Sequence, residues 1–488
     1  MQLSLPIPEL AQLALSAPSP QERIYCNRSL RLDQIDWVGF DMDYTLAIYR
    51  QHEMDRLSIE ATVDKLIARG YPERLRTMHY RTDFPVRGLL VDRKLGNVLM
   101  MDRYKYVKRA YHGFQELSLE QRRQAYHTRR LRPASGRYHW VDTLYGLSEV
   151  AVYAAVIDCL EGKEGEALNY ERLFNDVRTC IDLSHQDGSI LDHIVADHAR
   201  FVDRDDELAR TLHHLRSSGK RLFVLTNSYP NYTRAMMSFL LDGALHPYSD
   251  WSSYFDLVVT ASKKPAFFME ERPFMEVHGD EEFRPADKLE RGKLYAGGNL
   301  KDLMAALDTT PDRVLYVGDH IYGDVLRAHK STAWRTALIV QEMDAELDAH
   351  SDVVHSLTRL DALDEIRSQL ADDLRHHQGI VRRLQKKKDA GEITPAFEAE
   401  RVRHRRAVDR LRTRLRATQR EYDDLEKGVA HRFHPFWGSI FKAGAEQSSF
   451  GHQVEHYAGL YTSRVSNFLR YSPMHFFQSP RDRMPHEL

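Results

Sequence analysis

Three short apolar runs, each followed directly by polar residues, constrain the fold of this chain more than any other feature. They occupy residues 37–40, 221–225 and 314–317. Runs of this length with polar boundaries are typical of buried parallel strands. Helical patterns at residues 206–218 and 300–307 lie between them, so the sequence predicts βαβ units and an α/β fold with a Rossmann-like parallel-sheet core.

The spacing of these strands predicts two insertions. Residues 41–220 separate the first strand from the second, which is too long for a single crossover connection. We therefore expect a core of residues 24–46 and 201–358 that holds an inserted, mainly helical cap of residues 47–200. Residues 267–294 are charged, with scattered glycine and proline, and are typical of an excursion such as a hairpin.

The C-terminal part of the chain changes character to long charged helices. Residues 359–430 carry apolar side chains three and four positions apart, which predicts an antiparallel helical hairpin broken once at 389–395. The predicted seam comprises Leu374, Val381, Leu384, Val408, Leu411, Leu415, Thr418, Tyr422 and Leu425. Residues 431–488 are rich in aromatic side chains, so we expect this segment to pack on the core.

Composition and charge argue against several functional classes. The chain has 69 basic and 71 acidic residues and a formal net charge of −2, so no overall field draws it to nucleic acid or an anionic membrane. No apolar run approaches the roughly 20 residues of a membrane-spanning helix, and the N-terminal residues lack the basic region of a secretory signal. The three cysteines are far apart, which fits a reducing compartment. We therefore expect a cytoplasmic protein with no membrane or nucleic-acid partner.

Asp41 and Asp43 follow the first predicted strand, in the run Gly-Phe-Asp-Met-Asp-Tyr-Thr-Leu. Open α/β sheets bind ligands at the carboxyl ends of their strands. Hydrolysis of a phosphate monoester is very slow in water, and a covalent intermediate on a carboxylate divides it into easier steps. Asp41 is the candidate nucleophile. Asp43 can lie on the same side of an extended chain, protonate the leaving alkoxide and then deprotonate water.

Further polar residues follow the other two predicted strands. Two carboxylates beside a phosphate require a hard divalent cation with oxygen ligands. Asp319 follows the third strand as a candidate metal ligand, with Asp324 in the same glycine-containing loop. Lys264 could add positive charge to the transferring group. The second strand ends in donors for phosphate oxygens, namely Thr226, Asn227 and Ser228.

Each of these motifs alone has a simpler explanation. An Asp pair after a strand is often only a turn or a helix N-cap, and the lysine pair 263–264 alone is more often a solvated surface feature. Four elements nevertheless occur in one order, and three of them directly follow predicted strands. Chance placement of all four is therefore the weaker interpretation.

The four motifs resemble those of the haloacid dehalogenase superfamily. Within it, the chain is similar to the cytosolic purine 5′-nucleotidases that prefer IMP and GMP, over segments spread from about residue 24 to 487. Besides the run around Asp41, these segments are Phe84-Pro-Val-Arg-Gly88, Lys264-Pro265, Gly318-Asp-His-Ile-Tyr-Gly-Asp324 and Met484-Pro-His-Glu487. The resemblance implies a 5′-nucleotidase with Mg²⁺ as cofactor and an aspartyl-phosphate that passes to water or to a nucleoside.

The resemblance also implies a role for each residue of the site. Asp41 would be the nucleophile and a Mg²⁺ ligand, and Asp43 the acid/base and a ligand through its carbonyl. Asp319 would complete the metal site, which Asp324 would support through water. The phosphate would be held by Thr226, Asn227, Ser228 and Lys264.

For the base, one stretch of the cap resembles the segment that contacts the purine. It implies four contacts, namely Arg178, Asp182, the nearby His185, and Tyr145 stacked on the ring. A purine offers acceptors to Arg, N–H groups to Asp and a π-face to Tyr. The simpler alternative is an ordinary helix in which Arg178 and Asp182 form a salt bridge one turn apart. Gln186 stands where the family's pattern expects Tyr.

Regulation and assembly stay open at this point. Animal members of the family have a nucleotide effector site, and four residues fall near its positions, namely Gln453, Tyr457, Arg132 and Lys330. Asp142 and Trp140 depart from that pattern, which leaves activation by ATP undecided. We expect a homo-oligomer, either a dimer or a tetramer.

Two alternative functions remain. A phosphatase of another small phosphate ester would use the same fold. A nucleic-acid-binding or scaffold protein would instead use the basic run 401–420 of the hairpin. Nearby acidic residues dilute this run, and such runs are more often the solvated face of a coiled coil.

Overall fold

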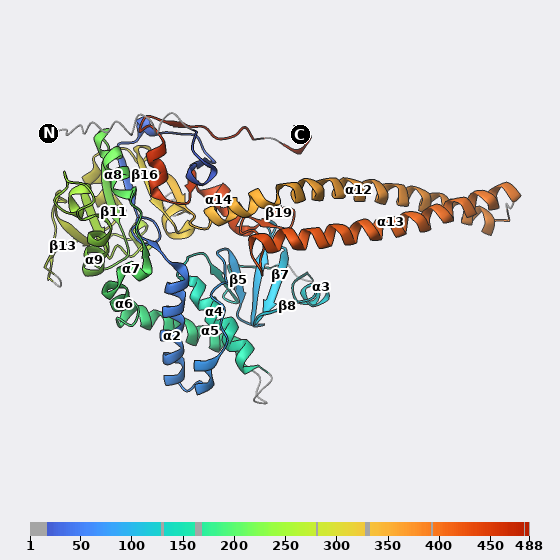
Figure 1. The fold of residues 1–488 in the computed structure, drawn as a ribbon, viewed down its shortest axis with the longest axis horizontal. Helices are drawn as coiled ribbons and strands as arrows, with labels where there is room; N and C mark the ends of the chain where they lie inside the picture. The colour runs from blue at the N-terminus through green and yellow to red at the C-terminus, as the bar shows by residue number, and fades with distance from the viewer. Residues whose placement is uncertain are drawn as a thin grey trace. The chain divides into compact units, whose positions relative to one another are not determined.

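The structure of the protein is a computed structural model that divides into two compact units (Figure 1). It describes residues 17–127, 131–161, 168–279, 282–326, 332–391, 394–482 and 484–487. The first unit comprises the chain up to Asp344 together with Ile440–Leu488, and the second is Ala345–Ser439. Among the described residues, every helix is too short or too polar to cross a membrane.

The centre of the first unit is a ten-stranded sheet in which the three predicted strands are neighbours. β3 (Trp37–Phe40) lies between β11 (Arg221–Leu225) and β16 (Val314–Gly318), and it is parallel to both. The predicted parallel core is therefore confirmed. Every residue of β3 and β16 is buried, as expected for strands that are covered on both faces.

Further strands extend this sheet on both sides, in the order β1-β20-β17-β16-β3-β11-β12-β15-β13-β14. The strands that continue its parallel part are β17 (Arg335–Ile339), β20 (Leu460–Thr462), β12 (Leu257–Thr260) and β15 (Leu294–Gly297). The antiparallel strands at its edges are β1 (Tyr25–Cys26), β13 (Phe274–His278) and β14 (Glu282–Pro285). β13 and β14 pair with each other and come from the excursion predicted at residues 267–294.

The core has three longer helices. α8 (Leu208–Ser217) precedes β11, α9 (Pro230–Leu241) follows β11, and α10 (Leu300–Leu307) follows β15. α8 and α10 correspond to the predicted helices. Leu303 and Leu307 of α10 belong to one apolar cluster with Trp37, Phe223 and Tyr316 of the sheet. The indole N–H of Trp37 also donates to the Leu307 carbonyl at 3.0 Å, so the same residues bury apolar surface and satisfy the end of the helix.

The segment inserted after β3 contains helices and a second sheet. Its helices are α2 (Gln51–Ala68), α3 (Leu119–Arg122), α4 (Gly146–Leu160), α5 (Tyr170–Gln186), α6 (Leu191–Ala196) and α7 (His198–Phe201). The sheet is five-stranded and antiparallel, and the sequence did not predict it. Its order is β8-β7-β6-β5-β9, with β5 (Leu89–Asp92), β6 (Asn97–Met101), β7 (Val107–His112), β8 (Gln115–Glu116) and β9 (Tyr138–Val141).

Helix periodicity explains how the inserted helices pack. α4 is buried from Leu147 to Ile157 because it contacts α2, α5, β7 and β9. α5 buries only one stripe, on which Phe174, Val177 and Ile181 recur three and four positions apart. Its opposite face is therefore free to present polar side chains.

Short strands join segments that are far apart in the chain. β4 (Ile48–Tyr49) pairs with β10 (Val202–Asp203), so the two ends of the insertion lie side by side. Near the C-terminus, the further elements are α14 (Ser449–Tyr457), β18 (Lys442–Ala443), β19 (Glu446–Gln447), and β21 (Phe476–Phe477), which pairs with β2 (Leu30–Arg31). With β20 in the main sheet, the C-terminal residues take part in the core.

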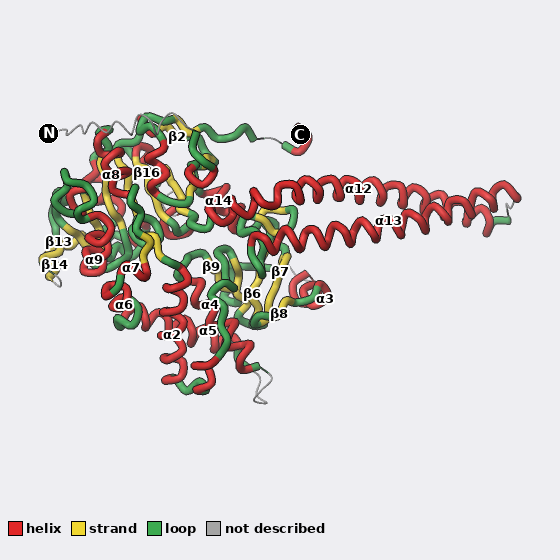
Figure 2. The backbone as a smooth tube through the Cα atoms, viewed as in Figure 1, coloured by secondary structure: helices red, strands yellow, loops and turns green. Residues whose placement is uncertain are grey.

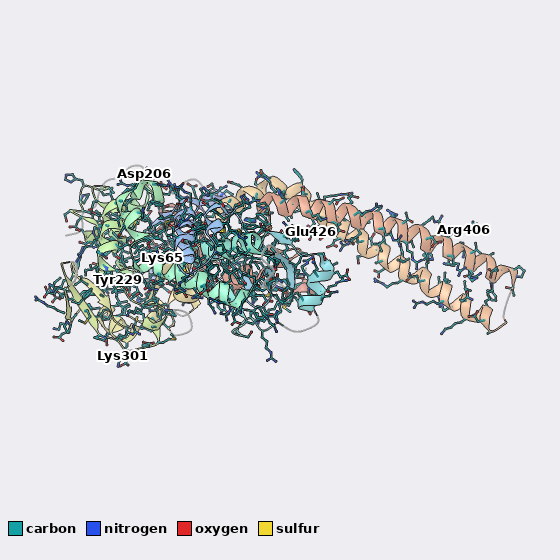
Figure 3. The ribbon with its side chains drawn as sticks, turned by 90° about the horizontal axis from the view of Figure 1, so that it is seen from below. Lys65, Asp206, Tyr229, Lys301, Arg406 and Glu426 are labelled. Carbon is teal, nitrogen blue, oxygen red and sulfur yellow. The ribbon has the colours of Figure 1, made fainter. Side chains whose placement is uncertain are left out.

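The second unit is built from two long helices, α12 (Met343–Asp389) and α13 (Pro395–Phe433) (Figure 2). They are antiparallel, because Asp352 pairs with Arg432 while Arg401 donates to Gln385. Of the predicted seam, Val408 and Thr418 are buried, and Tyr422 and Leu425 pack on an apolar cluster. Figure 3 shows Arg406 and Glu426 on α13.

The hairpin helices extend beyond the predicted limits of 359 and 430. α12 begins at Met343, because residues 343–358 contain neither glycine nor proline and continue the helical pattern. α13 ends at Phe433, where the backbone of His434 becomes extended. Its first turn is capped by Thr394, whose hydroxyl accepts the N–H of Phe397 at 3.3 Å.

Candidate active site

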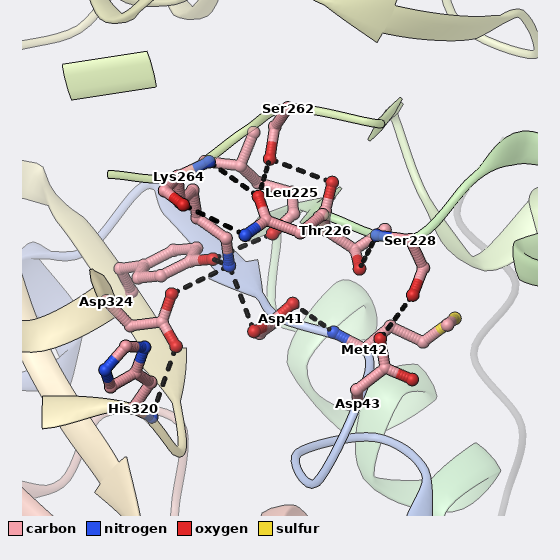
Figure 4. A network of polar contacts seen from close by, with 12 residues as sticks. Asp41, Met42, Asp43, Leu225, Thr226, Ser228, Ser262, Lys264, His320 and Asp324 are labelled. Carbon is pink, nitrogen blue, oxygen red and sulfur yellow. Dashed lines mark hydrogen bonds and ion pairs between the residues drawn. The ribbon is translucent and has the colours of Figure 1, made fainter. Parts of the chain in front are cut away.

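The predicted catalytic residues meet at one edge of the central sheet. Asp41 follows β3, Thr226 follows β11 and Asp319 follows β16, and these strands are parallel neighbours. Their carboxyl ends therefore point to the same edge, where open α/β sheets bind ligands. Figure 4 shows Asp41 and Thr226 there with Lys264 and Asp324.

Asp41 is a largely buried carboxylate with one cationic partner. Its Oδ1 accepts the N–H of Met42 at 2.8 Å, and its Oδ2 lies 3.0 Å from Lys264 Nζ. Burial raises the pKa of Asp41 well above its ordinary value, Lys264 lowers it, and the carboxylates of Asp324 and Asp319 raise it further. The candidate nucleophile therefore sits among more negative charge than one lysine balances.

Asp41, Asp319 and Asp324 form an acidic cluster whose ligand oxygens lie within 4.8 Å of one another. Burial raises the pKa of Asp319 to about 7, and Asp324 shifts it in the same direction. Carboxylate oxygens at this spacing are the ligands that a hard divalent cation prefers. In the part of the chain that the structure describes, no other three acidic, histidine or cysteine side chains come this close.

Asp324 shares Lys264 with Asp41, and both of its oxygens accept hydrogen bonds from the protein. Oδ1 accepts from Lys264 Nζ at 2.7 Å, and Oδ2 accepts the backbone N–H of His320 at 3.3 Å. Asp324 is also fully buried, with 1% of the residue exposed. The carboxylate of Asp324 thus binds Lys264 through one oxygen and the loop that follows β16 through the other.

Lys264 is the buried cation of the site, and Asn227 fixes its backbone. Nζ also donates to the hydroxyl of Tyr316 at 2.8 Å. Burial lowers the pKa of Lys264, but Asp324 and Asp41 more than offset this effect, so the pKa is raised and the amine is charged. Asn227 accepts the Lys264 N–H at 2.6 Å and donates to its carbonyl at 3.0 Å. The amide predicted to bind phosphate therefore also positions the lysine.

The two hydroxyls after β11 contact the protein's own loops. Thr226 is fully buried, and its Oγ1 accepts the N–H of Ser228 at 3.1 Å. The hydroxyl of Ser228 in turn donates to Asp43 Oδ2 at 2.5 Å. Ser228, predicted as a phosphate ligand, thus also holds the candidate acid/base (Figure 4).

The sequence did not reveal two tyrosines beside Asp43. The hydroxyl of Tyr49 donates to Asp43 Oδ1 at 2.5 Å and lies 2.8 Å from the hydroxyl of Tyr232. Burial raises the pKa of Asp43, and the hydrogen bonds from Ser228 and Tyr49 lower it. A carboxyl with a raised pKa suits proton donation near neutral pH. Tyr49 is only six residues after Asp43, so the sequence could have indicated that the two lie close together. Tyr232 lies on α9, far from Asp43 in the chain, and the sequence gives no such indication.

A cavity of about 1720 Å³ lies between the inserted segment and the core. It is lined by all four residues predicted to contact a base, namely Tyr145, Arg178, Asp182 and His185. Asn227, Ser228 and His320 line it from the core side. The structure therefore brings the predicted base contacts and part of the predicted phosphate site to one cavity.

Arg178 and Asp182 are exposed on the polar face of α5. The Arg178 guanidinium donates to Nδ1 of His139 at 3.0 Å. Burial lowers the pKa of His139 to about 4, and Arg178 acts in the same direction, so the imidazole is neutral and can accept this bond. Within the described residues, the alternative ion pair between Arg178 and Asp182 does not form. Asp182 thus keeps its acceptors for the cavity.

Glu149 is a further cavity residue that sequence reasoning missed. It lies one turn after Tyr145 on α4, and 8% of the residue is exposed. Burial raises the pKa of Glu149 to about 7, while Arg178 lowers it. Nothing in its local sequence distinguishes this acid from a surface glutamate, because its burial comes from the packing of α4.

The residues considered for an effector site lie elsewhere. Gln453 and Tyr457 are on α14, and Arg132 precedes β9, and none of these three lines the cavity. Lys330 lies outside the described residues. Asp142, which departs from the effector pattern, lines the cavity itself.

One comparison concerns solved structures. A structure described as a haloacid dehalogenase-like hydrolase from Bacteroides fragilis covers 63% of this chain and 88% of its own, with 13% sequence identity. Its TM-score is 0.24. The fold assignment rests on the strand order and the positions of the site residues.

Sequence comparisons are more informative. A 5′-nucleotidase domain-containing protein of Dictyostelium discoideum is 27% identical over 479 residues, which cover 96% of this chain and 75% of the relative. Human 5′-nucleotidase domain-containing protein 2 is 29% identical over 482 residues, which cover 95% of this chain and 85% of the relative. A family model described as the 5′ nucleotidase family matches residues 24–488. Because this match spans nearly the whole chain and includes every residue of the site, the protein belongs to the 5′ nucleotidase family.

Proposed function

We propose that the protein is a Mg²⁺-dependent 5′-nucleotidase that converts purine nucleoside 5′-monophosphates, in particular IMP and GMP, to nucleoside and phosphate. The observation that carries the proposal is the single cavity lined by residues of the catalytic loops and by the predicted base contacts. Family membership supports the reaction. Transfer of the phosphoryl group to a nucleoside in place of water belongs to the same proposal.

The reaction would proceed in two displacements at phosphorus. A carboxylate oxygen of Asp41 attacks phosphorus, the bond to the 5′-oxygen breaks, and Asp43 gives its proton to that oxygen. A water then loses a proton to Asp43 and attacks the aspartyl-phosphate, which releases phosphate and restores Asp41. The raised pKa of Asp43 and its bonds to Ser228 and Tyr49 support this double role.

Mg²⁺ fits the acidic cluster, because three carboxylates share the site with a single lysine. Asp41 and Asp319 would hold it through carboxylates and Asp43 through its carbonyl. Asp324, whose oxygens both accept hydrogen bonds from the protein, would support the site from outside. When bound, the ion neutralises charge so that an anionic phosphate can approach an anionic nucleophile. Lys264 would contribute a further fixed positive charge to the phosphate.

The cap residues would select a 6-oxopurine by complementary hydrogen bonds. The oxo group accepts from Arg178, and the ring N–H donates to Asp182. Adenine presents the opposite pattern, a donor at position 6 and an acceptor in the ring, so AMP would leave both side chains mismatched. Tyr145, whose ring packs edge-on against His185 at 5.5 Å between centroids, would offer its face to the base.

The test is phosphate release from IMP, GMP, AMP and pyrimidine monophosphates with and without Mg²⁺. We expect IMP and GMP to be hydrolysed faster than the others, and only with the metal. Activity toward another small phosphate ester but no nucleotide would favour a general phosphatase on this fold. Failure with every nucleotide would exclude the proposed function.

We also propose that the protein works in the cytoplasm. Support comes from Cys26, Cys159 and Cys180, which are all unpaired, as is usual in a reducing compartment. Cell fractionation followed by the nucleotidase assay tests this location, and activity confined to a membrane fraction would contradict it.

A further inference from the structure

Arg87 is a fully buried arginine that touches the loop carrying Asp319. It lies in the segment 84–88, just before β5 of the inserted region. Its Nη1 donates to the backbone carbonyl of Asp319 at 2.8 Å, and its Nε donates to Glu342 Oε1 at 2.7 Å. Nη2 donates to the other oxygen of Glu342, which makes the ion pair bidentate. Arg87 thus links the inserted region to two loops of the core.

The immediate surroundings leave the guanidinium little freedom. The ring of Phe450 lies 5.2 Å from its Cζ, which is within the range of a cation–π contact. The next residue is Gly88, with a positive φ of 86°, and a Cβ at this position would lie 2.5 Å from Phe450 Cβ. Glycine therefore lets Phe450 approach closely enough to cover the arginine.

Glu342 belongs to a short turn that contacts both catalytic loops. It follows β17, and its neighbour Gln341 donates to the backbone carbonyl of Tyr44 at 3.2 Å. Tyr44 is in the loop that carries Asp41, whereas Glu342 reaches the loop of Asp319 through Arg87. One turn thus holds the two loops whose carboxylates must face each other.

Arg87 does not belong to the substrate cavity. It is absent from the lining residues, and its side chain is 0% exposed. Burial of a charged group is unfavourable unless its bonds are satisfied, and removal of one partner of a buried pair is strongly destabilising. One of the hydrogen bonds of Arg87 goes to the backbone carbonyl of Asp319 itself, so Arg87 acts on the backbone from which the Asp319 side chain projects.

We propose that Arg87, oriented by Glu342, is a positioning residue that holds the backbone at Asp319 and keeps its carboxylate within shared coordination distance of Asp41. This inference rests on the proposed function, because the shared ligand would be the Mg²⁺ of that reaction. Residues that orient metal ligands typically contribute about 10- to 100-fold to metal affinity. Loss of the Arg87 bonds is therefore expected to act first on Mg²⁺ binding.

The test measures Mg²⁺ binding directly, by titration calorimetry and by the rise in melting temperature that the ion causes. Arg87→Met keeps the bulk of the side chain but removes its donors, and we expect Mg²⁺ to bind about 10- to 100-fold more weakly. Arg87→Lys keeps the charge and one donor and should recover part of the affinity. At saturating Mg²⁺, KM for IMP should stay close to the wild-type value, because Arg87 does not contact the cavity.

Arg216 provides a matched control. Its Nη1 donates to the carbonyl of Tyr254 at 2.9 Å and to Asp256 Oδ2 at 2.7 Å, so it also joins a backbone carbonyl to a carboxylate. It lies on α8, outside the site. Arg216→Met should lower the melting temperature and leave Mg²⁺ affinity unchanged.

If Arg87→Met fails to fold, a second variant tests whether Arg87 supports Mg²⁺ binding. Glu342→Gln keeps Arg87 in place but weakens its bidentate anchor, and a several-fold loss of Mg²⁺ affinity is expected. Wild-type Mg²⁺ affinity in both the Arg87 and Glu342 variants would overturn the inference and leave the proposed function intact. A wild-type protein that binds no Mg²⁺ would instead overturn the proposed function and this inference with it.

Discussion

The hydroxyl of Tyr49 lies 2.5 Å from Asp43 Oδ1 and donates its only hydrogen to that carboxylate. The contact of 2.8 Å between the hydroxyls of Tyr49 and Tyr232 must then have Tyr232 as the donor. Ser228 donates to the second oxygen of Asp43. The proposed acid/base is therefore held at one oxygen by a hydroxyl from β4 and at the other by a hydroxyl from the loop after β11, and the α9 hydroxyl of Tyr232 bonds to Tyr49 behind them.

Tyr49→Phe should lower kcat for IMP by about tenfold and leave KM nearly unchanged. A hydrogen bond to a charged group contributes about 1.5–3 kcal/mol, and part of this energy orients Asp43 for both proton transfers. Tyr49 does not line the cavity, so substrate binding should be preserved. Steady-state kinetics with IMP measure both constants.

Tyr248→Phe is the matched control for this change. Its hydroxyl is 2.9 Å from His213 Nδ1, and Tyr248 lies between α9 and β12, away from the catalytic loops. This variant should keep the wild-type kcat. Equal kcat values for the Tyr49 and Tyr248 variants would contradict the role assigned to Tyr49.

Asp41→Asn should abolish turnover without unfolding the protein. The amide is not a nucleophile of useful strength, so no phosphorus–oxygen bond can form on this side chain. The change also removes one of three clustered carboxylates, which relieves their repulsion. Acid-stable phosphorylation of the quenched enzyme, phosphate release and circular dichroism together check the prediction. Phosphate release at the wild-type rate from a folded variant would exclude Asp41 as the nucleophile.

Arg178→Ala should raise KM for IMP by about 10- to 100-fold, because a charge-assisted hydrogen bond to the base is worth about 1.5–3 kcal/mol. Hydrolysis of a small ester without a base, such as p-nitrophenyl phosphate, should be unaffected. Kinetic constants for the two substrates are compared with those of Arg172→Ala. Arg172 lies on the same helix and pairs with Asp176, outside the cavity. An equal KM for IMP in both variants would rule out Arg178 as a base contact.

The sequence predicted the catalytic edge because strand ends and polar residues coincide along the chain. Apolar runs end at Asp41, Thr226 and Gly318, and a parallel sheet must gather such ends at one edge. The five-stranded sheet of the insertion was missed for a different reason. β5 and β6 are buried at every position, and β7 carries two adjacent basic residues, Lys108 and Arg109, in its middle. None of the three strands therefore shows the alternation of apolar and polar residues that marks a half-buried strand.

The parts of the site that the sequence could not predict depend on long-range packing. The Tyr49 and Tyr232 hydroxyls meet across 183 positions of the chain, and Arg87 reaches Asp319 across 232. A buried arginine such as Arg87 needs hydrogen-bond partners. The sequence around it does not indicate which backbone carbonyl it will contact. Asn227 illustrates the same limit: its place after a strand was predicted, whereas its two bonds to the backbone of Lys264 required the fold.

Asp55 should make the protein less stable as pH rises. It is a buried carboxyl on α2, with 3% of the residue exposed, and burial raises its pKa from 3.8 to about 8. Between these two pKa values the folded protein keeps a proton that the unfolded chain has released, so the free energy of unfolding falls from about pH 4 to about pH 8. The only partner of its carboxyl among the described residues is Gln51, whose Nε2 donates to Oδ1 at 2.9 Å.

Asp55→Asn should remove this dependence, because the amide stays neutral at every pH. The variant should be more stable than the wild type at pH 8.5, by on the order of a few kcal/mol, and the difference should shrink toward pH 4. Urea unfolding at several pH values measures it. Asp158→Asn, which replaces an exposed carboxylate on α4, should follow the wild-type curve. An Asp55→Asn variant that also followed the wild-type curve would contradict this prediction. The pKa of Asp55 would then be the same in the folded protein and in the unfolded chain, and burial would not raise it.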